Sequence, residues 1–240
     1  MATIAIGDVH GCLEELDELL ALVLPRRHRV LFVGDLIDRG PDSAGVVARV
    51  RELGVPCVMG NHDDKAVRWA RHEARRRVDP AYPNPMRMSD ERIDEHARLS
   101  DADLAWLGTL PLTLALGGGW WATHAGAEPR RPWRRQTAAA LMRCRWVDGA
   151  GMMLRSLDRP DGAHHWAERW ARPESVVYGH HVHGLEHVRI DRRPDGVVCA
   201  GIDTGCCFGG HLSAYVIETG EVIQVKARRA YAELRVPDEA

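Results

Sequence analysis

The alternation of short apolar runs with helical patterns in the first 78 residues constrains the fold most. The strand-like runs are ATIAI at 2–6, RVLFVG at 29–34 and VPCVMG at 55–60, and amphipathic helical spacing follows each of them. A strand, helix, strand order favours parallel strands, because the helical crossover returns the chain to the same end of the sheet. We therefore expect an α/β fold that begins with a buried, largely parallel sheet.

The rest of the chain adds further strands and two irregular segments. Prolines break the pattern at about 78–105, and a segment rich in Arg and Trp fills 129–172. Strand-like runs follow the order WWATHAG, SVVYGHH, GVVCAGIDTG, LSAYVIE and EVIQVKA. The late, turn-separated runs predict a second sheet packed on the first. With no repeat or linker in the sequence, we expect one domain over 1–240, with insertions at about 78–105 and 129–172.

Charge and cysteine usage narrow the class of protein. The formal net charge is −2, so the overall charge does not favour a nucleic-acid or membrane partner. No apolar run approaches the roughly 18–20 residues that span a bilayer, and the N-terminus lacks the basic segment of a signal peptide. The six cysteines include no CxxC pair, which predicts reduced thiols in a cytoplasmic protein.

Polar side chains that bind metal ions stand at six predicted strand ends. They are Asp8 and His10, Asp35 and Asp38, Asn61 and His62, His124, His180 and His181, and Asp203. Taken alone, Asp8 or Asp35 fits a helix cap, His124 a hydrogen-bonded core histidine and Asn61 a turn. The same chemistry at six strand ends instead favours divalent ions that accept mixed oxygen and imidazole ligands.

Five ordered motifs carry a family resemblance. GDVHG at 7–11, GDLIDRG at 34–40, GNHD at 60–63, THAG at 123–126 and YGHH at 178–181 resemble the motifs of calcineurin-like metallophosphoesterases of the phosphoprotein-phosphatase type. The resemblance runs from residue 4 to about 227. DRGPDSAGVV, GNHDDK and GIDTGCCFGG are similar to a bacterial branch that includes the PrpE-type bis(5′-nucleosyl)-tetraphosphatases and the phosphatase domain of polynucleotide kinase-phosphatase.

The resemblance implies a two-sheet β-sandwich flanked by helices, with four αββα layers, and two bound divalent ions. Manganese is the expected metal, with iron, zinc, nickel and cobalt as alternatives. Asp8 and His10 would hold one ion and Asp35 would bridge to the second, and a hydroxide between the ions would attack phosphorus. The ligands that complete the second site would be Asn61, His124 and His180.

The same resemblance assigns roles around the metals. His62 resembles the general acid with Asp38 as its carboxylate partner, and Arg39 resembles the arginine that grips phosphoryl oxygens. Asp203 matches an acidic residue beside the site, and His181 stands where the family usually has threonine, so that it either lines the pocket or alters metal preference. A second phosphate-binding arginine is expected in the variable insertion, with Arg143 and Arg145 as candidates.

These features predict a metal-dependent phosphohydrolase acting on a phosphorylated small molecule, first of all a dinucleoside polyphosphate such as diadenosine tetraphosphate. Trp133, Trp146, Trp166 and Trp170 either stack a purine or pack their insertion against the core. A serine/threonine or tyrosine protein phosphatase, with a phosphoprotein as partner, is the alternative. A nucleic-acid end phosphatase and an inactive metal-binding regulator are further alternatives. The sequence gives no indication of oligomeric state.

Overall fold

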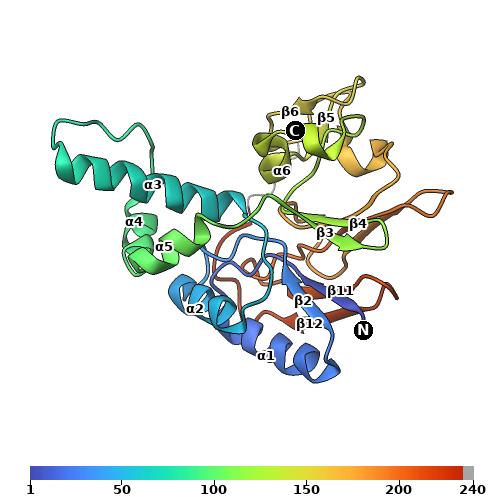
Figure 1. The fold of residues 1–240 in the computed structure, drawn as a ribbon, viewed down its shortest axis with the longest axis horizontal. Coiled ribbons are helices and arrows are strands. Elements are labelled where there is room, and N and C mark those ends of the chain that lie inside the picture. The colour runs from blue at the N-terminus through green and yellow to red at the C-terminus, as the bar shows by residue number, and fades with distance from the viewer. Residues whose placement is uncertain (235–240) are drawn as a thin grey trace.

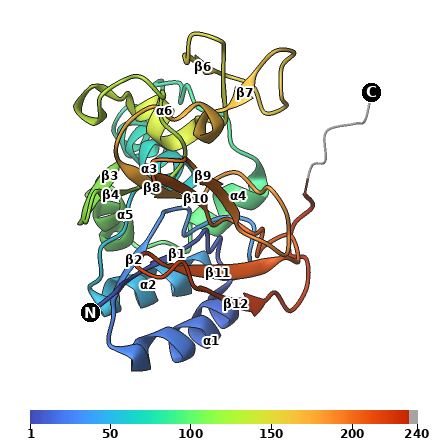
Figure 2. The same ribbon diagram turned by 90° about the vertical axis from the view of Figure 1, so that its right-hand side faces the viewer.

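The computed structural model describes residues 1–234, which form helices and sheets stacked in layers (Figures 1 and 2). The helices are α1 (Leu13–Val23), α2 (Ser43–Leu53), α3 (Asn61–Val78), α4 (Asp90–His96), α5 (Asp101–Leu107) and α6 (Ala138–Arg143), with 3₁₀ turns at Leu24–Arg26, Trp133–Arg135 and Trp166–Arg169. The strands are β1 (Thr3–Ile6), β2 (Arg29–Phe32), β3 (Thr113–Gly117), β4 (Trp120–Thr123), β5 (Trp146–Val147), β6 (Met153–Leu154), β7 (His164–His165), β8 (Ser175–Tyr178), β9 (Arg189–Arg192), β10 (Val198–Gly201), β11 (His211–Val216) and β12 (Val222–Lys226).

The first sheet has the order β12-β11-β1-β2, and α1 and α2 cover its outer face (Figure 2). β1 and β2 are parallel, whereas β11 pairs antiparallel with both β1 and β12. Two predictions are therefore wrong. The sheet is mixed rather than largely parallel, and β11 and β12 do not belong to the second sheet. β11 occupies the edge of β1 that β2 leaves open and satisfies it by backbone pairing, and β12 pairs with β11 in turn.

The prediction of a third strand at 55–60 is also wrong. This segment forms no strand, and one isolated parallel bridge joins its Cys57 to Phe32. Pro56 explains the difference, since it has no N–H to give to a ladder. Its carbonyl still accepts from Phe32, and Val58 donates to Phe32, so the segment follows β2 without forming a strand. The segment thus still delivers the start of α3 to the end of β2.

The second sheet has the order β3-β4-β8-β10-β9, in which the central strands β4, β8 and β10 are parallel. β3 and β9 pair antiparallel at its two edges, and the sequence patterns did not indicate either strand. A separate sheet, β6-β5-β7, lies within the second insertion together with α6. Figure 2 shows this insertion on the far side of the second sheet from α1 and α2.

Alternating side chains divide the core into three interfaces, as the period of two in a strand requires. Ile4 packs toward α1 and α2, while its neighbour Ala5 faces the second sheet. Val177 of β8 faces the first sheet. Cys199 of β10, the neighbouring strand in the sheet, belongs to the core cluster that contains the fully buried Trp166 of the second insertion. The fold is thus the predicted two-sheet sandwich between helical layers.

The two predicted insertions contain ordered elements. Residues 78–105 hold α4 and most of α5, beside the long α3 that extends away from the sheets (Figure 1). Residues 129–172 hold α6 and the small third sheet. One domain with two insertions stays our interpretation of this arrangement. The six cysteines are free and buried within residues 1–234, and in that part of the chain no helix combines the length and the apolar character that crossing a membrane requires.

Candidate active site

The carboxyl ends of β1, β2, β4, β8 and β10 bring the predicted ligands together where the two sheets meet. The loop after β1 is joined to the loop after β2 by backbone hydrogen bonds from Val9 and His10 to the carbonyl of Asp35. The backbone N–H of His180, just past β8, donates to the Asp8 carboxylate at 3.0 Å. The predicted strand ends therefore converge because the loops bind one another, not only because the strands lie parallel.

Left-handed backbone conformations are concentrated in these loops. Non-glycine residues with positive φ within residues 1–234 are His10, Arg27, Asp35, Asp38, Arg39 and His180. All but Arg27 are predicted site residues. Such conformations cost roughly 1–3 kcal/mol each and persist only where the surroundings impose them. These conformations therefore lower the stability of the fold, and the surrounding structure maintains them at the positions of the predicted site residues.

Asp35 lies at the centre of the site. Its Oδ2 is 3.5 Å from His10 Nε2 and 3.4 Å from His124 Nε2. Two groups whose ligand atoms lie within 4.8 Å of one another share Asp35: His10 and His62 belong to one, His124 and His180 to the other. One carboxylate between two ligand groups is the arrangement expected of a bridging ligand.

The ring nitrogens of the histidines test whether these residues suit metal ions. His10 Nδ1 donates to the Ile37 carbonyl and His124 Nδ1 donates to the Val33 carbonyl, each at 2.9 Å. With the proton on Nδ1, each Nε2 keeps a lone pair directed at Asp35. Metal-binding histidines are commonly oriented by such a backbone contact. His180 Nε2 is buried with no hydrogen-bond partner among the described residues, so it too is available as a ligand.

Three buried carboxylates give the site excess negative charge. Burial raises the pKa of Asp8, and the nearby Asp203 and Asp35 raise this pKa further. Burial also raises the pKa of Asp203. For Asp35 burial acts in the same direction, but His124 and His62 outweigh it and hold the pKa well below the usual range. A cation would relieve this repulsion, so the donor set and its charge fit divalent metal ions.

Asp63 fixes the loop that carries Asp35, a role that the sequence patterns did not indicate. The buried Asp63 carboxylate accepts hydrogen bonds from the backbone N–H groups of Asp35, Leu36 and Gly60 at 2.9–3.0 Å. A Cβ on Gly60 would overlap Asp35, so glycine is required there for the close approach.

The predicted acid pair is formed. His62 Nδ1 is 2.5 Å from Asp38 Oδ2, and His62 Nε2 is 4.0 Å from Asp35 Oδ2, so the second nitrogen faces the ligand groups. Burial raises the pKa of Asp38, but hydrogen bonds with His62 and His96 outweigh it and leave the pKa far below the usual range. His96 and Arg92 also contact Asp38, and sequence reasoning missed both of them.

Arg39 lies beside the ligand groups. Its Nη1 is 2.7 Å from His10 Nε2, and its guanidinium carbon is 5.0 Å from the centre of the Phe208 ring. The site thus already places a cationic group against a histidine ligand atom, in keeping with its excess negative charge. Arg39 also lines the open pocket, where it is placed to meet an anionic substrate.

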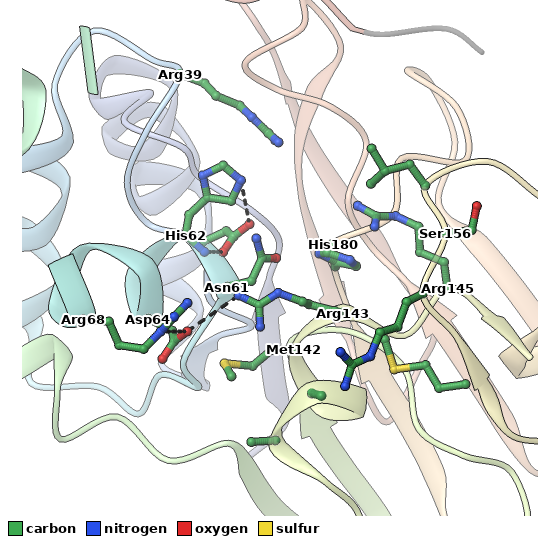
Figure 3. A pocket seen from close by; sticks show the side chains of 16 residues that line it. Arg39, Asn61, His62, Asp64, Arg68, Met142, Arg143, Arg145, Ser156 and His180 are labelled. Carbon is green, nitrogen blue, oxygen red and sulfur yellow. Dashed lines mark hydrogen bonds and ion pairs between the residues drawn. The ribbon is translucent and has the colours of Figure 1, made fainter. Parts of the chain in front are cut away.

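A pocket of about 750 Å³ opens on these residues (Figure 3). Its walls come from opposite sides: Asp64 and Arg68 from α3, and Arg143 from the end of α6. Arg143 and Arg68 both pair with Asp64, at 3.6 and 2.8 Å. The pocket is lined by Asp35, Arg39, Asn61, His62, Asp64, Arg68, Ala138, Ala139, Met142, Arg143, Arg145, Met153, Arg155, Ser156, Leu157 and His180.

The candidate arginines of the insertion differ in environment. Arg145 is partly buried, and burial lowers its pKa although Asp35 and Asp203 act in the opposite direction. Arg143 is more exposed, at 37% of its side chain. Both line the pocket, so the structure is compatible with either as the second phosphate-binding arginine.

His181 is not among the residues that line the 750 Å³ pocket. Its ring lies 4.1 and 5.4 Å from the rings of His183 and His165, measured between centroids. Ligand atoms of these three histidines lie within 4.8 Å of one another, but Arg189 stands 3.4 Å from His183 Nδ1. The adjacent positive charge of Arg189 disfavours a cation there. Asp203 is also absent from the pocket lining. Its carboxylate accepts a hydrogen bond from the backbone N–H of Gly205, two residues further on.

The tryptophans of the insertion pack rather than line the pocket. Trp166 and Trp170 are 0% and 3% exposed in the core of the insertion. Trp133 stacks on Trp121 with ring centroids 5.2 Å apart. Trp146 contacts the His165 and His181 rings. A purine-stacking role is therefore not supported for these four side chains.

The fold and these ligand groups define a metal-dependent phosphoesterase. Residues 1–214 match the family model described as calcineurin-like phosphoesterase, and the chain belongs to this family. It is accordingly a phosphohydrolase that depends on divalent metal ions.

Relatives over the whole chain carry more specific names. A symmetrical bis(5′-nucleosyl)-tetraphosphatase of Erwinia tasmaniensis is 30% identical, over 95% of this chain and 98% of that relative. The protein of the same name from Yersinia enterocolitica is 31% identical, over 100% and 96%. A solved structure described as a candidate diadenosine tetraphosphatase has 29% identity and a TM-score of 0.74, over 94% of this chain and 93% of the other.

Proposed function

We propose that this protein hydrolyses dinucleoside polyphosphates, with diadenosine tetraphosphate as the representative substrate. The observation that carries the proposal is the pocket, in which five arginines lie next to the ligand groups around Asp35. Its volume of about 750 Å³ lies within the range of small-molecule sites, roughly 300–1,000 Å³. The names of the full-length relatives support the same substrate class.

In the proposed reaction, some residues around the scissile phosphate bind the metal ions and another binds the phosphoryl oxygens. Asp8 and His10 would hold one divalent ion, Asn61, His124 and His180 the other, and Asp35 both. Bound metal ions supply positive charge that polarises the phosphoryl group and lowers the pKa of water. Arg39 presents a planar guanidinium, which pairs with two phosphoryl oxygens as charge builds on them.

His62 completes the reaction as proton donor. With Nδ1 on Asp38, its Nε2 faces the pocket. As the P–O bond to the leaving group breaks, the proton passes from Nε2 to the leaving oxygen, and neutral His62 then takes a proton from solvent. Asp38 keeps its charge and so stabilises the protonated ring before transfer.

The remaining arginines suit a chain of several phosphates. A monoester occupies only the phosphoryl site near Arg39, whereas a tetraphosphate extends past it and needs further cationic partners. Arg68, Arg143 and Arg155 line the same pocket and are the proposed partners of the further phosphates. Apolar side chains at the same pocket, including Met142 and Leu157, offer a surface for a nucleoside.

The first prediction concerns products. Purified protein loaded with Mn²⁺ is given diadenosine tetraphosphate and a phosphopeptide in parallel, and nucleotides are separated by chromatography. We expect cleavage at the central anhydride, which yields two ADP, much faster than phosphate release from the peptide. ATP plus AMP would show asymmetric cleavage. Rapid peptide dephosphorylation with intact dinucleotide would replace the proposal with a protein phosphatase.

The second prediction concerns Arg143. We expect Arg143→Ala to raise KM for diadenosine tetraphosphate about tenfold, the effect of losing one charge-assisted hydrogen bond. KM for 4-nitrophenyl phosphate should stay within about twofold, because this monoester does not extend to Arg143. Steady-state kinetics with both substrates check this, and the exposed Arg134→Ala serves as the matched control. An equal rise for both substrates would instead place Arg143 at the scissile phosphate.

Manganese is the proposed metal, since carboxylate, amide and imidazole ligands in one site suit Mn²⁺ as well as Fe²⁺ and Zn²⁺. A cytoplasmic location is proposed from the reduced-thiol pattern of the cysteines.

A further inference from the structure

Three residues of α4 contact the loop that carries Asp38, although α4 lies some 50 residues further along the chain. His96 Nε2 is 2.6 Å from Asp38 Oδ1, and Arg92 Nη2 contacts Asp38 Oδ2. Glu95 binds the Ser43 hydroxyl, which in turn accepts from the backbone N–H of Asp38 at 2.9 Å. The spacing of 92, 95 and 96 places all three on one face of the helix.

These contacts leave Asp38 no freedom to turn. One carboxylate oxygen is held by His96, and the other is shared between Arg92 and His62. The backbone of Asp38 has φ 74°, a conformation that its own chain does not favour. The carboxylate is therefore fixed from outside its loop, by side chains of the first insertion.

The chemistry of this face is unusual for a helix that only covers a core. His96 is 6% exposed, and its buried partner is an ionised carboxylate rather than apolar packing. His96 Nε2 is placed to donate to the Asp38 carboxylate, while its Nδ1 is buried with no hydrogen-bond partner among the described residues. Arg92 adds a positive charge on the same carboxylate, 3.5 Å from His62 Nδ1. The face thus acts on the partner of His62 through direct polar contacts.

We propose that His96, assisted by Arg92, is a positioning residue for proton donation by His62. Holding Asp38 in place keeps Nδ1 of His62 on the carboxylate and Nε2 turned to the pocket. The inference rests on the proposed role of His62 as proton donor. It gives the first insertion a part in the reaction, which neither its composition nor the family motifs assign.

Leaving-group dependence tests the proposal. The substrates are phenyl phosphate, whose leaving group is basic and needs a proton, and 4-nitrophenyl phosphate, whose leaving group departs without one. We expect His96→Ala to lower kcat about tenfold on phenyl phosphate and less than about threefold on 4-nitrophenyl phosphate. His96→Gln places an amide N–H near the position of Nε2 and should recover most of the lost rate. Asp94→Ala, exposed on the same helix, is the matched control.

Three outcomes are distinguishable. An equal loss on both substrates, without recovery in His96→Gln, would make the contact purely structural and overturn the inference. His62→Ala is the reference for the proton donor itself. If His62→Ala shows the selective loss and His96→Ala does not, the inference fails while the role of His62 stands. If His62→Ala shows no selective loss, the proton-donor assignment fails as well.

A second measurement does not depend on turnover. In the metal-free protein, the His62 Nδ1–H bound to Asp38 should give a downfield proton resonance, assigned by its absence in His62→Ala. His96→Ala should shift or broaden this resonance, and His96→Gln should restore it. A resonance unchanged in both variants would show that Asp38 holds His62 without help from α4. Thermal unfolding of each variant separates these results from loss of the fold.

Discussion

Asp35→Asn is expected to abolish measurable turnover and to remove most of the bound metal. The substitution keeps the shape of the side chain and an oxygen that can accept from the backbone N–H of His62, now 2.9 Å from Oδ1. Asparagine also tolerates the left-handed conformation of this residue, φ 50°. What it loses is the negative charge between His10 and His124. The loss should exceed the roughly 10–100-fold effects seen when only outer partners of metal ligands are changed.

Metal content and binding should be measured beside activity. Elemental analysis and calorimetric titration with Mn²⁺ should show a stoichiometry below two per chain in Asp35→Asn, with a cooperative unfolding transition retained. Asp17→Asn, on the surface of α1 and paired with Arg49, is the control and should bind metal as the parent does. Full metal occupancy with full activity in Asp35→Asn would rule out a bridging role for this residue.

The position of Asp35 could be predicted because the information is local. The buried strand β2 ends at Phe32, and Asp35 follows it directly after Val33 and Gly34. Asp42 is the N-cap of α2, and its carboxylate accepts from the backbone N–H of Gly45 at 2.8 Å. Parallel strands carry their carboxyl ends to one edge, so ligands at separate strand ends meet. The order of elements and the residues that follow each strand are therefore sufficient to predict where these ligands meet.

The contacts of α4 could not be predicted in this way. The segment RIDEHARL reads as a short helix with Arg92 and His96 four residues apart, but nothing in it specifies a partner. The contacts that place α4 join it to Asp38 and Ser43, which lie about 50 residues earlier in the chain. The pairing of β11 with β1 has the same origin. The contacts of α4 and the pairing of β11 with β1 join residues far apart in the sequence, and local sequence patterns do not specify such partners.

Arg39 carries the second large expected effect. Arg39→Ala should lower kcat/KM by about 10²–10³, which is the usual effect of removing one preorganised hydrogen-bond donor from the place where negative charge develops. The loss should be similar on phenyl and 4-nitrophenyl phosphate, because charge on the phosphoryl oxygens builds up with either leaving group. This uniform loss contrasts with the selective loss expected from His62 and His96. Kinetics with both esters therefore separate stabilisation of the phosphoryl group from proton donation.

Arg39→Lys sharpens the test, because lysine keeps the charge but not the planar pair of donors. We expect Arg39→Lys to recover only a small part of the lost rate, since a single ammonium group cannot pair with two phosphoryl oxygens. Arg49→Ala, at a partly exposed arginine of α2 that pairs with Asp17, controls for the loss of one positive charge and should leave kinetics unchanged. Full activity in Arg39→Lys would show that charge alone is required, and full activity in Arg39→Ala would place the phosphate contact on Arg145 or Arg143 instead.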